Sequence, residues 1–247
     1  MRFVVTICVL SLIVALLVTM QVTPAQAPSL AEQLAATNAR LAAIQQRSSR
    51  IRDINEIENL QRIYGYYTDK MLWDQVVDLF TEDGTLEIGL SGVYVGKDSL
   101  RRYLYSLSDG RQGPIEGVLY EHLQLQSIIT VSDDGQSADG RWRDLIQTGT
   151  YGAGSGGQWG EGPYENEYVK ENGVWKINKL HWYATFIAPY EGGWLKVSED
   201  AVRDYSVGKG VMPDRPTSDN YPSYPATSIP PFHFANPVTG DPWKPDP

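Results

Sequence analysis

IRDINEIENLQRIYGYYTDKMLWDQVVDLF, residues 51–80, is the stretch on which the fold of this chain depends. Its apolar side chains recur every three or four residues, which predicts an amphipathic helix with one buried stripe. That stripe comprises Ile54, Ile57, Leu60, Ile63 or Tyr64, and Tyr67. A second, shorter helix is predicted from Trp73 to Phe80. Between the two, the segment Tyr64–Asp69 brings aromatic rings and a carboxylate to the end of an apolar face, which favours a pocket wall over simple core packing.

Composition limits the classes of function. The 247 residues suffice for one domain of ordinary size plus extensions. The net charge is −9 and no block of Lys and Arg occurs, so nucleic acid and anionic lipid surfaces are not supported as partners. The single cysteine, Cys8, lies in an N-terminal apolar run. A mature domain without it would have no disulfide, no thiolate nucleophile and no cysteine-based metal site.

Residues 1–27 have the pattern of an export signal. Arg2 precedes the apolar run Phe3–Met20, and Ala25-Gln26-Ala27 resembles a cleavage site. The run is also close to the roughly 20 residues that span a bilayer, and Pro28 directly follows the expected cut. A cleaved signal peptide and an uncleaved membrane anchor therefore both fit. Either one predicts an exported protein that is periplasmic, secreted or anchored to the membrane.

A helical extension is predicted for residues 28–50. Its apolar residues follow a rough a/d seam, which is typical of a coiled coil. The seam comprises Leu34, Leu41, Ile44 and Ile51, interrupted by Thr37 and Ser48. A short coiled-coil stalk and a solvated helix leading into the domain are the two interpretations.

The chain after Phe80 predicts one further helix and a set of strands. Glu82–Gly84 is read as a turn, and Asn172-Gly173 has the signature of a type I′ hairpin turn. The predicted strands are Thr85–Ile88, Val93–Val95, Gly117–Val131, Ser137–Thr150, Tyr164–Val169 and Val174–Phe186, and the helix is Lys97–Leu107. Helices followed by long antiparallel strands predict an α+β fold in which about three N-terminal helices cap a curved sheet.

Residues 188–247 are rich in Pro, Gly, Ser and Tyr and predict an irregular C-terminal arm, with one helix near Ser198–Tyr205. The arm is too aromatic for a disordered tail, so we expect it to lie on the domain or on a neighbouring subunit. Upstream, Gly152–Gly157 matches the glycine spacing of a dinucleotide-binding loop. It lacks the strand before it and the helix after it, so it is interpreted as a loop between strands.

From about Ile51 to Phe186 the chain resembles the SnoaL-like group of the nuclear transport factor 2-like superfamily. The resemblance follows the order of several short motifs. They are Tyr64, Asp69, Trp73-Asp74, Phe80–Gly84, Gly96–Leu100, His122, Ile129–Val131, Ala138–Trp142 and Asn172–Ile177. The resemblance implies a domain over residues 51–187 with a cone-shaped, curved antiparallel sheet.

Within this group the chain is most similar to bile-acid 7α-dehydratase and, more distantly, to scytalone dehydratase. The resemblance places catalytic residues at Tyr64, Asp69 and His122. Two further dehydratase positions depart from the pattern, because an expected Asp falls near Ile146 and an expected Arg near Ala184. The base of ketosteroid isomerase would fall near Ile88, which disfavours that reaction.

These residue types suit a cofactor-free and metal-free elimination or isomerisation of an apolar, polycyclic hydroxy-carbonyl compound. His122 would take and return a proton, Asp69 would orient its ring, and Tyr64 would donate to the enolate oxygen. The residues expected to contact the substrate are Tyr67, Trp73, Trp142, His181 and Tyr183. The alternatives are a satisfied polar His, a capping Asp and a core Tyr, in an exported protein that binds a small apolar ligand without turnover.

An oligomer is also predicted. Members of the superfamily commonly pair through the open sheet face, and the strands carry more aromatic residues than one interior is expected to absorb. These residues are Trp142, Tyr164, Tyr168 and Trp175. The simplest assembly is a homodimer with the arm from Ala188 crossing onto its partner.

Overall fold

The computed structural model describes residues 27–152, 156–198, 200–206 and 210–244. The chain divides into two compact units, residues 1–46 and residues 47–247. The described part of the first unit is the N-terminal portion of helix α2, which runs from Leu30 to Asp69. Residues 1–26 lie outside the described residues, so the export signal stays a prediction. No helix in the described ranges is both long and apolar enough to span a bilayer.

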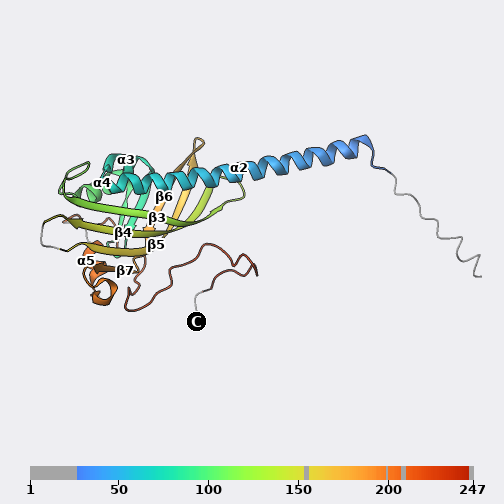
Figure 1. Cartoon of the computed structure of the whole chain (residues 1–247). Coiled ribbons are helices and arrows are strands. Elements are labelled where there is room, and N and C mark those ends of the chain that lie inside the picture. The colour runs from blue at the N-terminus through green and yellow to red at the C-terminus, as the bar shows by residue number, and fades with distance from the viewer. Residues whose placement is uncertain (1–26, 153–155, 199, 207–209, 245–247) are drawn as a thin grey trace, which may run out of the picture. The chain divides into compact units, whose positions relative to one another are not determined.

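The second unit is an α+β domain built on one curved, unclosed sheet (Figure 1). Its strands run in the order β2-β1-β6-β5-β4-β3, and β7 pairs with β5. They are β1 (Phe80–Ile88), β2 (Val93–Val95), β3 (Val118–Val131), β4 (Ser137–Thr150), β5 (Gln158–Glu171), β6 (Val174–Trp182) and β7 (Phe186–Pro189). The helices are α3 (Trp73–Asp78), α4 (Gly96–Ser106), the 3₁₀ turn η1 (Gly193–Lys196) and α5 (Ala201–Ser206).

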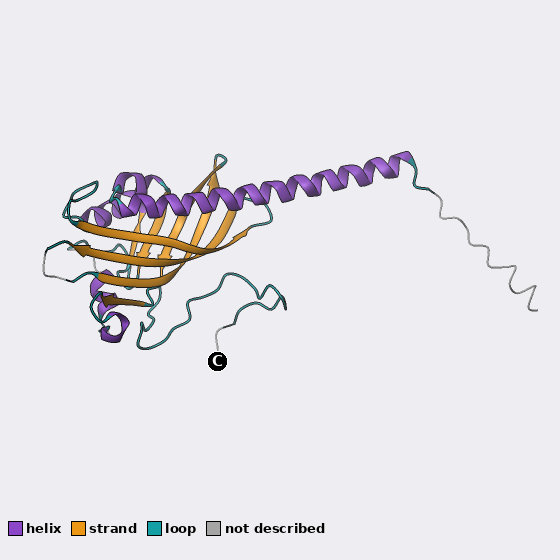
Figure 2. Ribbon diagram, in the orientation of Figure 1, coloured by secondary structure: helices purple, strands orange, loops and turns teal. Residues whose placement is uncertain are grey.

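Helices cover one face of this sheet, as expected. Figure 2 shows α2, α3 and α4 on one side of the strands. The α2 residues buried on this side are Asp53, Ile57, Gln61, Tyr64, Gly65 and Thr68. The predicted stripe is therefore confirmed at Ile57, and of the two alternatives Ile63 and Tyr64 it is Tyr64 that is buried.

Two details of the predicted sheet are wrong. The sheet is mixed, because β1 pairs in parallel with β6. The expected turn at Glu82–Gly84 instead lies inside β1, where the register against β6 shifts between Phe80 and Thr85. Residues with turn preference are accommodated there by a bulge, which bends a strand without reversing it.

The long strands are close to those predicted. β3 and β4 match, and Asn172 and Gly173 have φ values of 52° and 81°, as a type I′ turn requires. β5 begins earlier than expected, because its first residues pair with both β4 and β7. The predicted last strand is divided at Trp182 into β6 and β7.

The aromatic residues predicted for an exposed sheet face are core residues. Trp142, Tyr164, Tyr168 and Trp175 are all at most 4% exposed. They belong to the cluster packed beneath the helices, where alternation along β4, β5 and β6 places them. The observation behind the predicted oligomer is thus removed, and the oligomer itself stays a prediction.

The predicted arm includes η1 and α5, and α5 confirms the helix expected near Ser198–Tyr205. Its residues 210–244 are irregular and pack on their own domain. Arg215 exchanges backbone hydrogen bonds with Val93 at the edge of the sheet. Farther along, the arm places Phe232 4.2 Å from the guanidinium of Arg141 on β4. Contact with its own domain was one of the two expected positions for the arm.

Candidate active site

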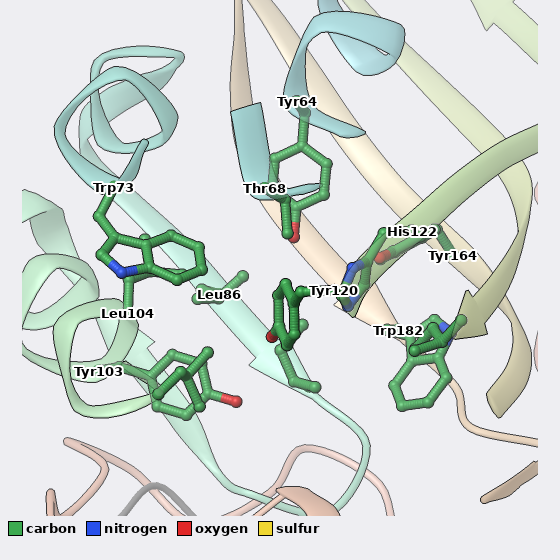
Figure 3. Close-up of a pocket in the computed structure, with 13 residues that line it drawn as sticks. Tyr64, Thr68, Trp73, Leu86, Tyr103, Leu104, Tyr120, His122, Tyr164 and Trp182 are labelled. Atoms are coloured by element: carbon green, nitrogen blue, oxygen red, sulfur yellow. The ribbon is translucent and has the colours of Figure 1, made fainter. Parts of the chain in front are cut away.

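A cavity of about 250 Å³ lies between the helices and the sheet. Figure 3 shows its wall, to which α2, α4 and several strands contribute. The lining residues are Tyr64, Thr68, Trp73, Leu86, Ile88, Tyr103, Leu104, Leu107, Tyr120, His122, Ile146, Tyr164 and Trp182. Most of these side chains are aromatic or aliphatic, so the few polar groups among them determine what chemistry the cavity can support.

His122 supplies the cavity with an uncharged base. Strand alternation in β3 turns Tyr120 and His122 to the same side, with ring centres 4.4 Å apart. The imidazole is buried, and its Nδ1 has no hydrogen-bond partner within the described residues. Burial lowers the pKa of His122 to about 3. The ring is therefore neutral near pH 7 and can accept a proton.

Tyr64 supplies a phenol to the same cavity wall as His122 (Figure 3). Its ring packs edge-on against Phe80 and Tyr164, with centres 6.5 and 6.3 Å away. Burial raises the pKa of Tyr64 well above its usual value. One turn along α2, the hydroxyl of Thr68 is buried without a hydrogen-bond partner among the described residues. Sequence analysis missed Thr68, although its spacing of four residues from Tyr64 places it on the same helix face.

Asp69 does not orient the imidazole, so the predicted pairing of the two side chains is wrong. Its Oδ1 accepts a hydrogen bond of 2.7 Å from the backbone N–H of His122. Burial raises the pKa of Asp69 to about 6, although this hydrogen bond opposes the shift. The carboxylate lines a separate surface pocket formed by α2 and β3 and is absent from the cavity wall. Asp69 joins the end of α2 to β3 and so positions His122 through the main chain.

One of the five predicted substrate contacts lines the cavity. Trp73 does so, and its indole nitrogen donates to Ser108 Oγ at 2.8 Å. Tyr67 is half-buried and does not reach the wall. Trp142 is directed into the core, where its indole donates to the Tyr168 hydroxyl.

His181 and Tyr183 do not line the cavity because the residue between them does. Trp182 occupies the inner face of β6, and alternation turns its neighbours away. His181 stacks on Tyr183 at 3.8 Å, and the Tyr183 hydroxyl donates to Asp219 of the arm. His181 Nε2 also lies 3.7 Å from Glu87 Oε1. His181, Tyr183 and Glu87 thus form a separate buried cluster that the arm contacts through Asp219.

Asp144 is the acidic residue that sequence analysis missed. The expected carboxylate was placed near Ile146, but Asp144 precedes that residue by two positions and has the same inward orientation. It is fully buried, and Tyr164 on the cavity wall donates its hydroxyl to Asp144 Oδ2 at 2.7 Å. Burial raises the pKa of Asp144 to about 8, so the group is largely protonated at neutral pH. The pattern of alternate buried positions in 137–150 could have indicated it.

Replacing Asp144 by Asn should change how stability depends on pH. The folded pKa is about 8 and the unfolded value is 3.8, so the folded protein binds the extra proton between these limits. The contribution of Asp144 to stability is therefore greatest below pH 4 and is lost as pH rises toward 8. Asn cannot ionise, yet its oxygen can still accept from Tyr164. Thermal melts from pH 4 to 8 should show the variant gaining stability relative to the parent as pH rises. A constant difference would show that Asp144 does not carry the shifted pKa.

Three solved structures are similar to part of this chain. A putative scytalone dehydratase from Novosphingobium aromaticivorans is 21% identical, with a TM-score of 0.50 over 58% of this chain and 91% of that one. A single-residue variant of Rv3472, a protein of unknown function from Mycobacterium tuberculosis, is 23% identical over 56% and 74%, with a TM-score of 0.47. A type 2 hexachlorocyclohexane dehydrochlorinase, LinA, is 19% identical over 58% and 92%, with a TM-score of 0.48.

No curated protein matches the chain. The model of the SnoaL-like domain matches residues 49–181, which is more than half of the 247 residues. The matched segment begins in α2 and ends in β6, so it includes most of the cavity wall and both His122 and Tyr64. The chain therefore belongs to the SnoaL-like domain family of the nuclear transport factor 2-like superfamily.

Proposed function

We propose that the protein is a cofactor-independent lyase or isomerase that removes a proton next to the carbonyl group of a small apolar substrate. The observation that carries this proposal is the neutral imidazole of His122 on the wall of an apolar cavity, with a ring nitrogen that makes no hydrogen bond to the described residues. A buried, neutral imidazole with an unbonded ring nitrogen can accept a proton from a molecule bound in the cavity.

The proposed reaction starts when His122 takes the α-proton and becomes an imidazolium. Burial disfavours that charge in the empty cavity, as the low pKa of His122 indicates. In the complex, the enolate charge develops beside the ring, and the two opposite charges stabilise each other. Tyr64 donates its hydroxyl to the enolate oxygen. The imidazolium then returns the proton either to a departing hydroxyl, which leaves as water, or to another carbon of the substrate.

The cavity size bears on the substrate class. A 150 Å³ apolar cavity holds one benzene molecule, and drug-sized ligands occupy pockets of roughly 300–1,000 Å³. A volume of about 250 Å³ therefore suits a compound with one or two rings. This proposal replaces the polycyclic substrate expected from sequence. The aromatic walls formed by Trp73, Tyr103 and Trp182 suit a flat ring system.

The test is a panel of one-ring and two-ring β-hydroxy ketones, incubated with the protein in D₂O. Thermal stabilisation reports binding, and mass spectrometry reports deuterium uptake and loss of water. The corresponding diols, which have no carbonyl, serve as matched compounds and should bind without exchange. A four-ring steroid ketone should neither bind nor react. Absence of deuterium uptake with every ketone that binds would contradict the proposal.

A ligand-binding protein without turnover is the second candidate. Three observations favour it. Asp69 pairs with the main chain of His122, and Ile146 occupies the cavity wall. Ala184, where an arginine was expected, is buried, and its N–H donates to the Tyr221 hydroxyl. In the panel, this candidate requires thermal stabilisation by ketones and diols alike, with no exchange.

Tyr64→Phe should lower kcat/KM, because the loss of one oxyanion donor removes about 3 kcal/mol of transition-state stabilisation. Folding stability should change little, because only a hydroxyl is removed from a ring that keeps its packing. Tyr66→Phe is the matched control, because Tyr66 lies on the same helix and is 72% exposed. Steady-state kinetics with a ketone from the panel measure both variants. An equal loss in the two variants would exclude Tyr64 as the donor.

A further inference from the structure

The N-terminal half of α2 carries a seam of exposed apolar residues. Leu30, Leu34, Leu41 and Ile44 are 82%, 60%, 52% and 63% exposed. All of residues 30–46 are exposed, and the side-chain hydrogen bonds of this segment are local ones near its start. Single exposed leucines are ordinary on a surface, but a row of them along one helix indicates an interaction site.

The spacing of the seam identifies its partner. Positions 30, 34, 37, 41, 44, 48 and 51 alternate in steps of four and three, which is the a/d spacing of a coiled coil. The helix is continuous from Leu30 to Asp69, so no break interrupts this spacing. Every copy of the chain carries the same seam at the same residue positions. In two parallel copies, each a or d residue therefore packs against the identical residue of the other copy. We propose that the protein self-associates through a parallel, in-register coiled coil over residues 30–51.

Charge is compatible with the parallel orientation over most of the seam. In that arrangement a g residue meets the e residue five positions later on the neighbouring helix. The contacts at positions 33/38 and 40/45 each include an uncharged amide side chain, whereas the last one pairs Arg47 with Arg52. An antiparallel pair would instead place g residues opposite each other, and Arg40 and Arg47 both occupy g positions. Like charges at such contacts oppose association, so the parallel coiled coil should be tightest over residues 30–44.

The residue types at the seam also bear on the number of chains. Leu34 and Leu41 occupy a positions, whereas Ile44 and Ile51 occupy d positions. Leucine at a combined with isoleucine at d shifts parallel coiled coils toward three or four helices. This surface is distinct from the sheet face on which the sequence-based oligomer prediction rested.

Cysteine cross-linking tests the seam directly. In the full-length chain with Cys8→Ser, Leu34→Cys places a thiol in an a layer, where identical residues of parallel chains meet. Ala36→Cys is the matched control, because it lies two residues away, is exposed, and points away from the seam. Disulfides form only when the Cα atoms approach to within about 7 Å. Under mild oxidation, Leu34→Cys should give at least about tenfold more cross-linked chain than the control. Equal yields would overturn the proposal.

Light scattering gives an independent test on the same full-length chain in mild detergent. Leu34→Asp combined with Leu41→Asp should lower the mass of the assembly, because charge in the seam opposes association. Ala35→Asp combined with Ala42→Asp adds the same charge to the same helix outside the seam and should leave the mass unchanged. Tryptophan fluorescence confirms that the domain is folded in both. An unchanged mass in the seam variant would overturn the proposal.

Discussion

His122→Ala is expected to reduce proton abstraction by roughly 10²–10⁴-fold, the contribution typical of a positioned general base. Within the described residues, no second imidazole lines the cavity. The described cavity wall of the His122→Ala variant therefore has no other uncharged base of comparable strength. Ligand affinity should be largely kept, because the interaction with the proton is made mainly in the transition state. Deuterium uptake into a bound ketone measures proton abstraction, and thermal stabilisation measures ligand affinity.

His181→Ala is the matched control for that experiment. His181 is also a buried imidazole, and neither of its ring nitrogens has a hydrogen-bond partner in the described part of the chain. It lies in the cluster beside Glu87 and Tyr183, outside the cavity wall. Its removal should leave exchange nearly unchanged. Similar losses in both variants would indicate a general effect of emptying a buried site and would contradict a base at His122.

The position of Asp69 changes what its variants should do. A carboxylate that oriented the ring would be needed for catalysis in its charged form. Here Asp69 accepts from the backbone N–H of His122, and an asparagine oxygen can accept the same hydrogen bond. Asp69→Asn should therefore be mild, whereas Asp69→Ala should release the contact between α2 and β3. Rescue by Asn distinguishes positioning through the main chain from orientation of the imidazole.

The sequence was most informative where apolar periodicity decided the structure. Alternation placed β3 and β4 almost at their observed ends, and the Asn-Gly pair placed the hairpin between β5 and β6. Three-to-four spacing also narrowed one inner position of α2 to Ile63 or Tyr64, and Tyr64 is the buried one. Family resemblance then directed attention to His122, which does lie on the cavity wall.

The sequence was least informative where polar residues are buried. Gln61 on α2 is fully buried because it meets Gln124, Asn166 and the Tyr168 hydroxyl across the core. These partners come from two strands, β3 and β5, so local spacing could not identify them. The same holds for Asp144, whose burial depends on Tyr164 of the neighbouring strand. On β6, alternation alone did not decide which side chains face the cavity. Trp182 faces it, and its neighbours His181 and Tyr183 do not.

Among these buried polar residues, Asp53 has the largest expected effect on stability. Its carboxylate is 4% exposed and forms an ion pair with Lys170 of β5. The same oxygen, Oδ1, accepts from the indole N–H of Trp175 of β6 at 3.1 Å. One residue of α2 thus holds two strands, on the helix that also carries Tyr64. The loss of this contact should weaken the docking of α2 on the sheet.

Asp53→Ala should lower the free energy of unfolding by about 3–5 kcal/mol, because it leaves the partly buried ammonium of Lys170 without its counter-charge. Asp133→Ala is the control, since its carboxylate is fully exposed in its ion pair with Arg50 and its loss should change stability little. If the pair acts as a unit, Lys170→Met added to Asp53→Ala should recover part of the loss, because no buried charge then remains. Urea unfolding of the parent and the three variants measures these differences. A further loss when Lys170→Met is added to Asp53→Ala, or equal losses at Asp53 and Asp133, would show that the buried ion pair does not hold α2 to the sheet.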